Sequence, residues 1–479
     1  MRDNQIAPPA RRYLTDVVVL GCGAPGLLAA LRARRAGLEV TVLDVGDARD
    51  ENLLWIPESY HSARNYLDHV LGDATVEQSQ RRHDFLQAAT SLPQLLAEFG
   101  VGLAKTKIRD NYPQLSSASK GRVCRVIYKE KFWNLANAVI DSSVLKMQFL
   151  SVAIQEEVSV WSAEGLEDLV WRDGRVIGLR VRRAGTPIIV EANFGVVLAS
   201  GGFGQNVKLR RRFLPGTRAD RQLEVDGDGC VIEAAVNHGL DLGSMARTWS
   251  SIGMQDPLGE GWVDATEAVR AGHSMLVDSA GLRFCDESEP PEMLAERFEK
   301  AWLVFDSAHR KTVSLGSLKP GYVPRKAAEN GRLRKAKSLE ELARVIRAPR
   351  LTESVKRFNV MADAGNDLDF GRDWQILGNE ENAGIRGRLT QARQSLVSLA
   401  RRGNGLTNGP FYAVEIRPCD AGTKGGIIVD SQARALRGGE PVQGLYAIGS
   451  AAASICELRS PATGTRATER LCGAAQIAF

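Results

Sequence analysis

Apolar and polar positions near the start of the chain follow the order of a strand, a turn, a helix and a second strand. The run Val17 to Leu20 is short and rich in β-branched residues, which predicts a buried parallel strand. Apolar positions between Leu27 and Ala36 recur with helical spacing and stop at Gly37. The next apolar run, Val40 to Leu43, predicts a second strand. Together these elements predict a βαβ unit of a parallel sheet.

The turn between the first strand and the helix has the spacing G-x-G-x-x-G. In a dinucleotide site the first glycine makes the turn, the second admits the pyrophosphate and the third lets helix and strand pack closely. An acidic residue about 20 positions later binds a ribose hydroxyl. A purely structural turn is the alternative; a lipoprotein cleavage site would need a longer apolar run, which Asp16 interrupts. The residues expected to hold a dinucleotide here are Gly21, Gly23, Ala24, Pro25, Gly26 and Asp44.

Helical and alternating patterns then follow each other along the chain. Helices are expected around Ser59 to Val70, from about Val76 to Phe99, and over Lys131 to Leu145. A β-rich piece comes next, in which Asp173-Gly174 between two alternating runs predicts a hairpin. Its expected strands are Asp168 to Arg172, Val176 to Arg182 and Ile188 to Glu191.

Two further apolar runs lead into glycines, at Gly195 to Phe203 and at Gly444 to Ser450. Between them, Gly227-Asp228-Gly229 precedes a predicted helix, where backbone amides and a carboxylate could meet phosphate or ribose. The residues that we expect to complete the dinucleotide site are Ser200, Gly201, Gly202, Asp228, Gly449 and Ser450.

The composition is typical of a globular protein and does not indicate a nucleic-acid-binding or membrane protein. The 479 residues predict two domains, and 44% hydrophobic with 25% charged residues is typical of a globular protein. A net charge of +5 does not indicate nucleic-acid binding, and no stretch reaches the ~18 apolar residues of a membrane span. Seven cysteines without a C-x-x-C pair favour a reducing cytoplasm, and the scattered histidines predict no metal site.

Several longer blocks carry a resemblance over nearly the whole chain. In order, they are GVVLASGGFGQN from Gly195, GDG from Gly227, DSAGLRFCDES from Asp278, AWLVFD from Ala301, SVKRFNVMADAGNDLDFGR from Ser354, GPFYAV from Gly409, GTKGGIIVD from Gly422 and GLYAIGSAAAS from Gly444. The chain resembles the FAD-dependent fumarate reductase and 3-ketosteroid dehydrogenase group, most closely its ketosteroid dehydrogenase-like branch.

This resemblance implies an α/β fold, a glutathione-reductase-like FAD-binding Rossmann domain with an inserted α+β cap. We place the FAD domain at 1–263 and 407–479 and the cap, or substrate domain, at 264–406. Within the cap, Ser338-Leu339-Glu340-Glu341 predicts a capping box, and a helix beginning after Thr352 ends before Gly365. The covalent flavin-histidine motif of some relatives is not visible, so we expect non-covalent FAD. The loop Asp47 to Leu53 also lacks the glycine-and-serine-rich segment that relatives place along the flavin.

In the ketosteroid dehydrogenases, a donor pair polarises the substrate ketone, a tyrosine removes a proton and flavin N5 takes the hydride. Their donor segment T-Y-P-G-x-G matches Arg459 to Gly464, so Ser460 replaces the tyrosine while Gly464 keeps the donating amide. Their base segment N-E-S-x-P-Y matches Asp286 to Pro291, and proline has no proton to exchange. A third family tyrosine, from a D-Y-Y-P segment, matches Tyr112.

The expected catalytic residues are therefore Tyr112, Glu289, Arg459, Ser460 and Gly464. Each has a plainer alternative. Glu289 is either the replacement base or a solvated carboxylate in a proline-flanked loop, and Tyr112 is either an acid or base or the anchor of a loop. Glu457 and Arg459 either bind a polar or anionic substrate or form a salt bridge with each other. Tyr412 is expected to pack under the flavin domain rather than to react.

The sequence thus predicts a cytoplasmic FAD-dependent oxidoreductase. The expected reaction is desaturation of a CH–CH bond next to a carbonyl, on a ketosteroid-like, polycyclic or polar ketone, or the reverse alkene reduction. Its partners would be that small molecule and an electron acceptor or donor that the sequence does not identify. The alternative is a flavin-binding family member that has lost redox turnover and serves a non-redox or structural role.

Overall fold

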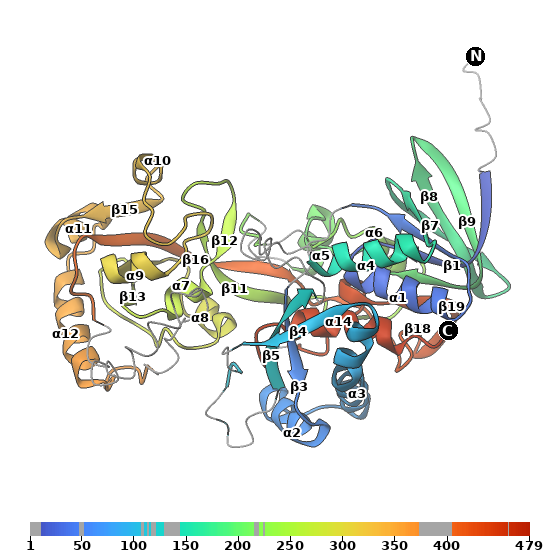
Figure 1. Cartoon of the computed structure of the whole chain (residues 1–479), viewed down its shortest axis with the longest axis horizontal. Coiled ribbons are helices and arrows are strands. Elements are labelled where there is room, and N and C mark those ends of the chain that lie inside the picture. Colours follow the sequence, from blue (N-terminus) through green and yellow to red (C-terminus); the bar gives the residue numbers. More distant parts are fainter. Residues whose placement is uncertain are drawn as a thin grey trace, which may run out of the picture. The chain divides into compact units, whose positions relative to one another are not determined.

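The fold is described from a computed structural model (Figure 1). It describes residues 11–46, 52–106, 110–112, 115, 121–128, 144–214, 220–223, 226–372, 405–457 and 459–479. The chain forms two compact units: unit 1 comprises Met1–Ala219, Glu224–Thr248 and Gly422–Phe479, and unit 2 comprises Asp220–Leu223 and Trp249–Ala421. The predicted helix over Lys131 to Leu145 lies mostly outside the described residues. In the described part of the chain, no helix combines the length and the apolar character needed to cross a membrane.

Unit 1 is built on a mostly parallel sheet. Its order is β18-β19-β9-β1-β2-β6, from strands Arg434–Arg437, Glu440–Ala447, Thr186–Leu198, Arg11–Leu20, Val40–Asp44 and Ser159–Ser162. Neighbours β19, β9, β1, β2 and β6 run parallel, with β1 paired between β9 and β2. The antiparallel hairpin β7 (Gly165–Arg172) and β8 (Arg175–Arg183) continues onto β9. The predicted βαβ unit and the hairpin at Asp173-Gly174 are confirmed.

The strands expected at Ile188 to Glu191 and from Gly195 are one strand, β9, rather than two. The first half of β9 pairs with β8 on one side and β1 on the other, and its second half pairs with β1 and β19. Such long-range pairing holds the backbone extended through Asn193 and Phe194, where the local apolar pattern breaks. For the same reason β1 begins at Arg11, before the apolar run that predicted it.

Helices cover this sheet and a small second sheet. They are α1 (Ala24–Arg35), α2 (Tyr60–Leu71), α3 (Val76–Glu98), α4 (Val144–Gln155), α5 (Val207–Phe213), α6 (Cys230–Asn237) and α14 (Thr465–Gln476). The small sheet has the order β3-β5-β4, from Leu53–Pro57, Gly121–Tyr128 and Val101–Lys105, and β10 (Leu242–Gly243) pairs with β17 (Gly426–Ile427). Ser59 and Thr75 cap α2 and α3, which confirms both predicted helices. Helix α14 packs against α1, α3 and β3.

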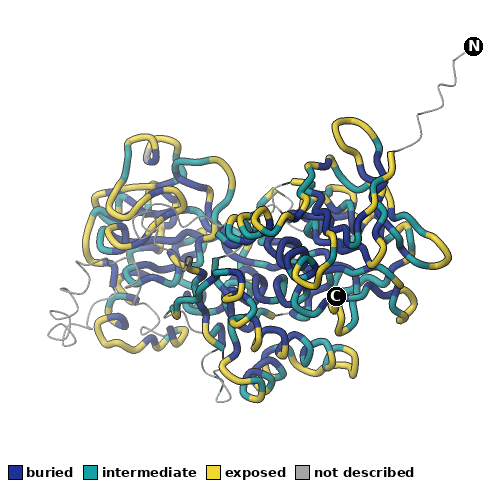
Figure 2. The backbone as a smooth tube through the Cα atoms, turned by 45° about the vertical axis from the view of Figure 1, so that its right-hand side comes forward, coloured by how far each residue is buried: buried dark blue, intermediate teal, exposed yellow. Residues whose placement is uncertain are grey.

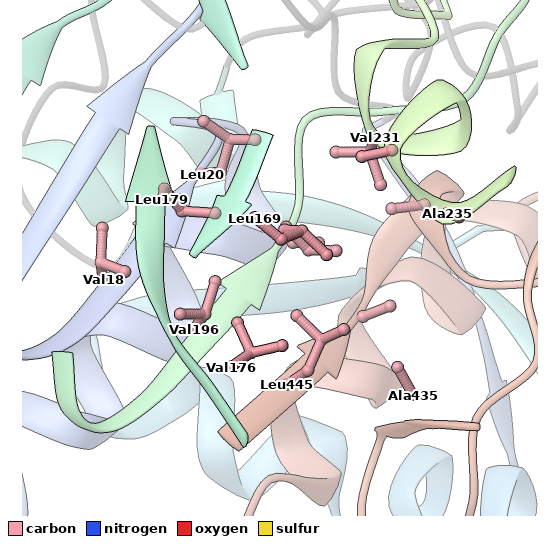
Figure 3. Packing of buried hydrophobic residues seen from close by; sticks show 14 of the residues in the cluster. Val18, Leu20, Leu169, Val176, Leu179, Val196, Val231, Ala235, Ala435 and Leu445 are labelled. Carbon is pink, nitrogen blue, oxygen red and sulfur yellow. The ribbon is translucent and has the colours of Figure 1, made fainter. Parts of the chain in front are cut away.

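One hydrophobic core of unit 1 lies where the parallel sheet meets the β7–β8 hairpin and α6 (Figure 3). The labelled side chains come from elements far apart in sequence: Val18 and Leu20 of β1, Leu169 of β7, Val176 and Leu179 of β8, Val196 of β9, Val231 and Ala235 of α6, Ala435 of β18 and Leu445 of β19. Strands buried on both faces read as continuous apolar runs, which is the pattern that predicted them.

Unit 2 is α+β, with a sheet of its own. The order is β12-β11-β16-β14-β13, from Trp262–Asp264, Thr248–Gln255, Phe411–Thr423, Ala301–Phe305 and Ser274–Val277, and β15 (Leu333–Ala336) also pairs with β16. Its helices are α7 (Thr266–Arg270), α8 (Pro291–Arg297), α9 (Ser307–Thr312), α10 (Arg325–Glu329), α11 (Leu339–Ile346) and α12 (Leu351–Ala364). The expected cap, 264–406, lies inside unit 2, which extends further at both ends because β11 and β16 are neighbours in this sheet.

Local details of unit 2 differ from two predictions. Ser338 caps α11, accepting from the N–H of Glu341 at 3.2 Å, but the Glu341 carboxylate accepts from the N–H of Lys337 and not of Ser338, so only half of the capping box forms. Tyr412 does pack, but in the core of unit 2 and not under the flavin domain, because β16 belongs to this sheet; its ring stacks on Phe305 at 5.5 Å. Burial raises the pKa of Tyr412. Figure 2 shows the buried stretches of both units.

Candidate active site

The predicted glycine segments lie at one edge of the sheet, where three parallel strands of unit 1 end. Strands β1, β9 and β19 end at Leu20, Leu198 and Ala447, and each is followed at once by one of these segments. Backbone hydrogen bonds continue the pairing past the strand ends, from Ala199 N–H to Leu20 O at 2.7 Å and from Ile448 N–H to Leu198 O at 3.0 Å. In open α/β sheets, ligands bind outside the carboxyl ends of the strands.

The first turn shows why its glycines are needed. Gly21 has φ of +114°, and a Cβ there would overlap the carbonyl of Ala199; a Cβ on Gly26 would overlap the carbonyl of Gly21. Gly23, the N-cap of α1, instead has φ of −76°, which any residue adopts. We expect its lack of a side chain to allow close approach of a ligand to the backbone at the helix N-terminus, where the dipole favours phosphate. Ala24 and Pro25 form the buried first turn of α1.

The remaining predicted cofactor residues gather around this turn. Asp44 ends β2, the neighbour of β1, and its Oδ1 accepts from Gly46 N–H at 3.2 Å. The segment Gly227–Gly229 packs on Ser200–Gly202: Gly229 N–H donates to Gly202 O at 3.1 Å, and a Cβ on Gly227 would lie 3.0 Å from Ser200 O. A Cβ on Gly449 would lie 3.5 Å from Cγ of Pro25, so Gly449, which Ser450 follows in the chain, lies beside the start of α1.

The predicted donor segment, Arg459–Gly464, is held against the segment Asp110–Tyr112. Asn111 donates from its backbone N–H to Pro461 O and from Nδ2 to Ser460 O, each at 2.9 Å. The structure thus brings together Tyr112, Arg459, Ser460 and Gly464, four of the five residues predicted to be catalytic.

Gly464 is placed to donate through its amide. It is the N-cap of α14, with φ of +84°, and a Cβ there would lie 2.8 Å from Leu53 O, so a side chain is excluded. Its buried N–H has no acceptor among the residues that the structure describes. The Ser460 hydroxyl, by contrast, donates to Ala462 O at 3.1 Å within the segment. A preorganised donor is therefore available at Gly464, while that of Ser460 is engaged.

Of the two alternatives for Arg459 and Glu457, the salt bridge between them does not form among the described residues. Arg459 is exposed, with its guanidinium carbon 5.9 Å from the ring centroid of Tyr112, a cation–π arrangement. The Tyr112 side chain is buried. Glu457 accepts from Nε2 of Gln78, on α3, at 2.9 Å. The guanidinium of Arg459 therefore remains accessible to an anionic group of a substrate.

Glu289 lies in unit 2, in the segment that leads into α8. Both of its carboxylate oxygens accept from Arg297, at 2.6 and 2.5 Å. Pro291, which the resemblance matches to the family tyrosine, is the first residue of α8 rather than part of a loop. Proline suits this position because the first helical N–H needs no partner within the helix.

Comparisons with known proteins show the family of this chain. The model of the FAD binding domain family matches residues 16–475. The chain belongs to this family. It is 27% identical to the 3-oxosteroid 1-dehydrogenase of Mycolicibacterium smegmatis, over 94% of each chain. It is 26% identical to the 4-oxocyclohexanecarboxylate 2-dehydrogenase of Sinomonas cyclohexanicum, over 96% of this chain and 91% of that protein. The crystal structure of a 3-ketosteroid Δ1-dehydrogenase from Sterolibacterium denitrificans has the same fold, with TM-score 0.81, 22% identity, and coverage of 97% and 98%.

The protein is thus a FAD-dependent oxidoreductase, and the residues present fit the cofactor. The cradle at Gly21 and Gly26 is closed to side chains, α1 begins at the carboxyl edge of the sheet, and Asp44 ends the neighbouring strand. FAD would be held by the residues predicted for it, in the order expected of a dinucleotide fold.

Sequence reasoning missed three residues of this flavoprotein that support the donor segment. Asn111, Tyr66 and Trp55 bind it or its neighbour, Asp110–Tyr112. The block Asp110-Asn111-Tyr112-Pro113 points to this segment, but the resemblance matches only Tyr112 to a family residue. Nothing in the local pattern around Tyr66 or Trp55 points to partners some 400 positions away.

Proposed function

We propose that this flavoprotein desaturates the CH–CH bond next to a ketone, or reduces the corresponding alkene, in a cyclic substrate that also carries a carboxylate. One observation carries the proposal: a buried donor amide, Gly464, and an accessible guanidinium, Arg459, belong to the same short segment. In an oxo acid, the ketone oxygen could accept from the Gly464 amide while the carboxylate binds the Arg459 guanidinium.

Gly464 would donate to the ketone oxygen, on which negative charge develops when the neighbouring C–H proton leaves. A donor fixed beforehand is effective because it needs no reorganisation during the reaction. Arg459 would bind the carboxylate through charge-assisted hydrogen bonds, for which its planar guanidinium is suited. Bound FAD would supply the hydride acceptor for desaturation or the donor for reduction.

We assign the proton transfer to Tyr112. Its phenol belongs to the same cluster as Arg459 and Gly464, within unit 1. To act as the base, Glu289 would first have to break both of its hydrogen bonds to Arg297. We therefore propose a structural role for Glu289 in unit 2. Ser460 becomes a donor to substrate only if its hydroxyl leaves Ala462 O.

The name of the Sinomonas relative supports this substrate class. Its substrate, 4-oxocyclohexanecarboxylate, contains a ring ketone and a carboxylate. The 3-oxosteroid relatives support a ring ketone alone. Pro291 weighs against the steroid because general-base catalysis typically contributes about 10²–10⁴-fold and the usual tyrosine is missing.

Anaerobic mixing of the oxidised holoenzyme with candidate substrates tests the proposal. We expect 4-oxocyclohexanecarboxylate to bleach the flavin absorbance faster than cyclohexanone, which lacks the carboxylate, and faster than an androstenedione. Rapid reduction of the flavin by the steroid would overturn the proposal that the substrate is an oxo acid. If photoreduced enzyme is reoxidised by no enone and oxidised enzyme is reduced by no ketone, the non-redox alternative gains.

A further inference from the structure

We infer that Asn111 and Tyr66 are positioning residues that set the orientation of the donor segment Arg459–Gly464. We call this pair the Asn111–Tyr66 clamp. The inference rests on the proposed function for its catalytic consequence, but the clamp itself is a property of unit 1 that can be measured without any substrate.

The clamp holds two consecutive carbonyls. Asn111 Nδ2 donates to Ser460 O and Asn111 N–H donates to Pro461 O, each at 2.9 Å, while the Tyr66 hydroxyl donates to the same Pro461 O at 2.6 Å. Fixing successive carbonyls fixes the peptide planes between them, and the proline ring already restricts φ at Pro461. Few torsions then remain between the clamp and Gly464.

Tyr66 also connects the segment that contains Tyr112 to Pro461. The backbone N–H of Tyr112 donates to the Tyr66 hydroxyl at 3.3 Å, while that hydroxyl donates to Pro461 O. The side chain of Tyr66 is fully buried, and hydrogen bonds are stronger in such surroundings than in water. The Tyr66 hydroxyl therefore links the backbone of Tyr112 directly to the donor segment.

Trp55 supports the same arrangement from β3. Its indole Nε1 donates to Asp110 Oδ1 at 3.0 Å, and its backbone N–H donates to Gly464 O at 3.4 Å. Trp55 thus links one end of each segment, at Asp110 and at Gly464, while the clamp holds the two segments together in the middle. Reacting groups need this precision, because a misplacement of about 1 Å can cost about 10²-fold in rate.

The chemistry of Asn111 suggests a sharp variant. Its Nδ2 is used as a donor, whereas its Oδ1 has no partner among the described residues. Asn111→Asp keeps the size of the side chain, removes the donor and places negative charge beside Ser460 O. Tyr66→Phe keeps the ring and removes only the hydroxyl, so it tests the clamp even if the aspartate variant does not fold.

Asn359 provides the matched control. It makes two hydrogen bonds to the backbone of Leu406, in unit 2, from Nδ2 at 3.1 Å and to Oδ1 at 2.8 Å. Asn359→Asp removes a comparable side-chain donor from a segment that this inference does not involve.

Amide hydrogen exchange of the peptide covering Arg459–Gly464 is the first measurement, on holoenzyme with verified FAD content. We expect exchange to rise by about tenfold or more in Asn111→Asp and Tyr66→Phe, as for loss of one hydrogen bond, and to stay unchanged in Asn359→Asp. With a substrate found for the parent enzyme, kcat should fall by about 10–100-fold while KM changes by less than about threefold. Unchanged exchange in both variants, or a fall in activity caused only by lost FAD, would overturn the inference. If the parent turns over no ketone, the proposed function fails, and the exchange result still decides the clamp.

Discussion

Gly23 and Gly26 lie in the same turn, and we expect them to be glycine for different reasons. At Gly26 the protein itself excludes a side chain, because a Cβ would overlap the carbonyl of Gly21. At Gly23 the backbone has ordinary dihedral angles, so we expect a bound pyrophosphate to require the glycine. The two positions therefore separate cofactor binding from folding.

Gly23→Leu should give a folded protein that is colourless, whereas Gly26→Leu should give little folded protein. The side chain at residue 23 blocks the approach of phosphate to the backbone, and the side chain at residue 26 forces α1 away from the sheet. Circular dichroism and FAD released on denaturation distinguish the two cases. A folded Gly23→Leu variant with stoichiometric FAD would contradict the role given to this turn.

Arg459→Gln should raise KM for an oxo acid by about 10–100-fold, which is the loss in affinity expected when one or two hydrogen bonds to a charged group are removed. KM for a ketone that lacks the carboxylate should change little. Steady-state kinetics on the acid and on the neutral ketone provide the comparison. Equal KM changes for both substrates would show that Arg459 does not bind the carboxylate.

Ser460→Ala should leave turnover within about threefold, because the Ser460 hydroxyl is already bound to Ala462 O. Removal of a donor to the reacting oxygen typically costs far more, about 10²–10³-fold in rate. Steady-state kinetics of this variant on the same substrates give the measurement.

His309 should make unit 2 sensitive to acid. Its side chain is fully buried, its Nε2–H donates to Ala268 O at 2.9 Å, and burial lowers its pKa to about 4. Unfolded chains bind a proton at a pKa near 6.5, so between about pH 6.5 and 4 the unfolded state binds more protons than the folded state. Stability should therefore fall as pH drops through this window, by up to roughly 3 kcal/mol.

Urea unfolding at several pH values tests this expectation. His309→Gln removes the titrating group while keeping an N–H donor, and should flatten the dependence between about pH 6.5 and 4. His238, which pairs with Asp168 at 2.6 Å in unit 1, provides a comparison, because His238→Gln leaves the buried site in unit 2 intact. An unchanged slope in His309→Gln would show that other groups cause the acid sensitivity.

At the scale of elements, the segment before α8 is held by buried charge. Glu287 bonds to Arg283 at 2.6 Å and to Arg372 at 3.2 Å, and Arg283 also reaches Asp367 at 2.8 Å. The side chains of Glu287, Arg372 and Asp367 are fully inaccessible to solvent. Arg372 further donates to the carbonyls of Ser274 and Ala271, so the network ties this segment to β13.

Arg372→Met should destabilise unit 2 by about 3–5 kcal/mol, because it leaves Glu287 buried without one of its two cationic partners. The double variant Arg372→Met, Glu287→Met should recover part of that loss, since buried pairs replaced by apolar residues are often close to neutral. Chemical unfolding of the parent, the single variants Arg372→Met and Glu287→Met, and the double variant gives the comparison. If the double variant is as unstable as the sum of both single variants, the pair is not coupled.

Elements whose signals are local could be predicted from the sequence. Ser59 and Thr75 mark the starts of α2 and α3, and Gly365 ends α12 where expected. Elements set by distant partners could not: β9 is continuous because β8, β1 and β19 pair with it in turn. The candidate site divides in the same way. Its glycines follow a spacing, but the hydrogen bond from Asn111 to Ser460 joins residues 349 positions apart.

At the scale of the whole molecule, each unit has its own hydrophobic core. One large cluster in unit 1 joins the parallel sheet to α6 and the β7–β8 hairpin, while two clusters in unit 2 lie around the sheet that contains β14 and β16. Separate cores allow each unit to unfold as its own cooperative transition. The residues predicted to bind FAD all belong to unit 1.

FAD should therefore raise the unfolding temperature of unit 1 and leave that of unit 2 nearly unchanged. A ligand at about 100 times its Kd stabilises the native state by about 2.7 kcal/mol, and only the unit that binds it gains this energy directly. Differential scanning calorimetry of the apoprotein and of protein in excess FAD should show two transitions, of which one moves. Arg372→Met should shift the other transition, which assigns it to unit 2. A single transition that shifts as a whole with FAD would show instead that the two cores unfold together.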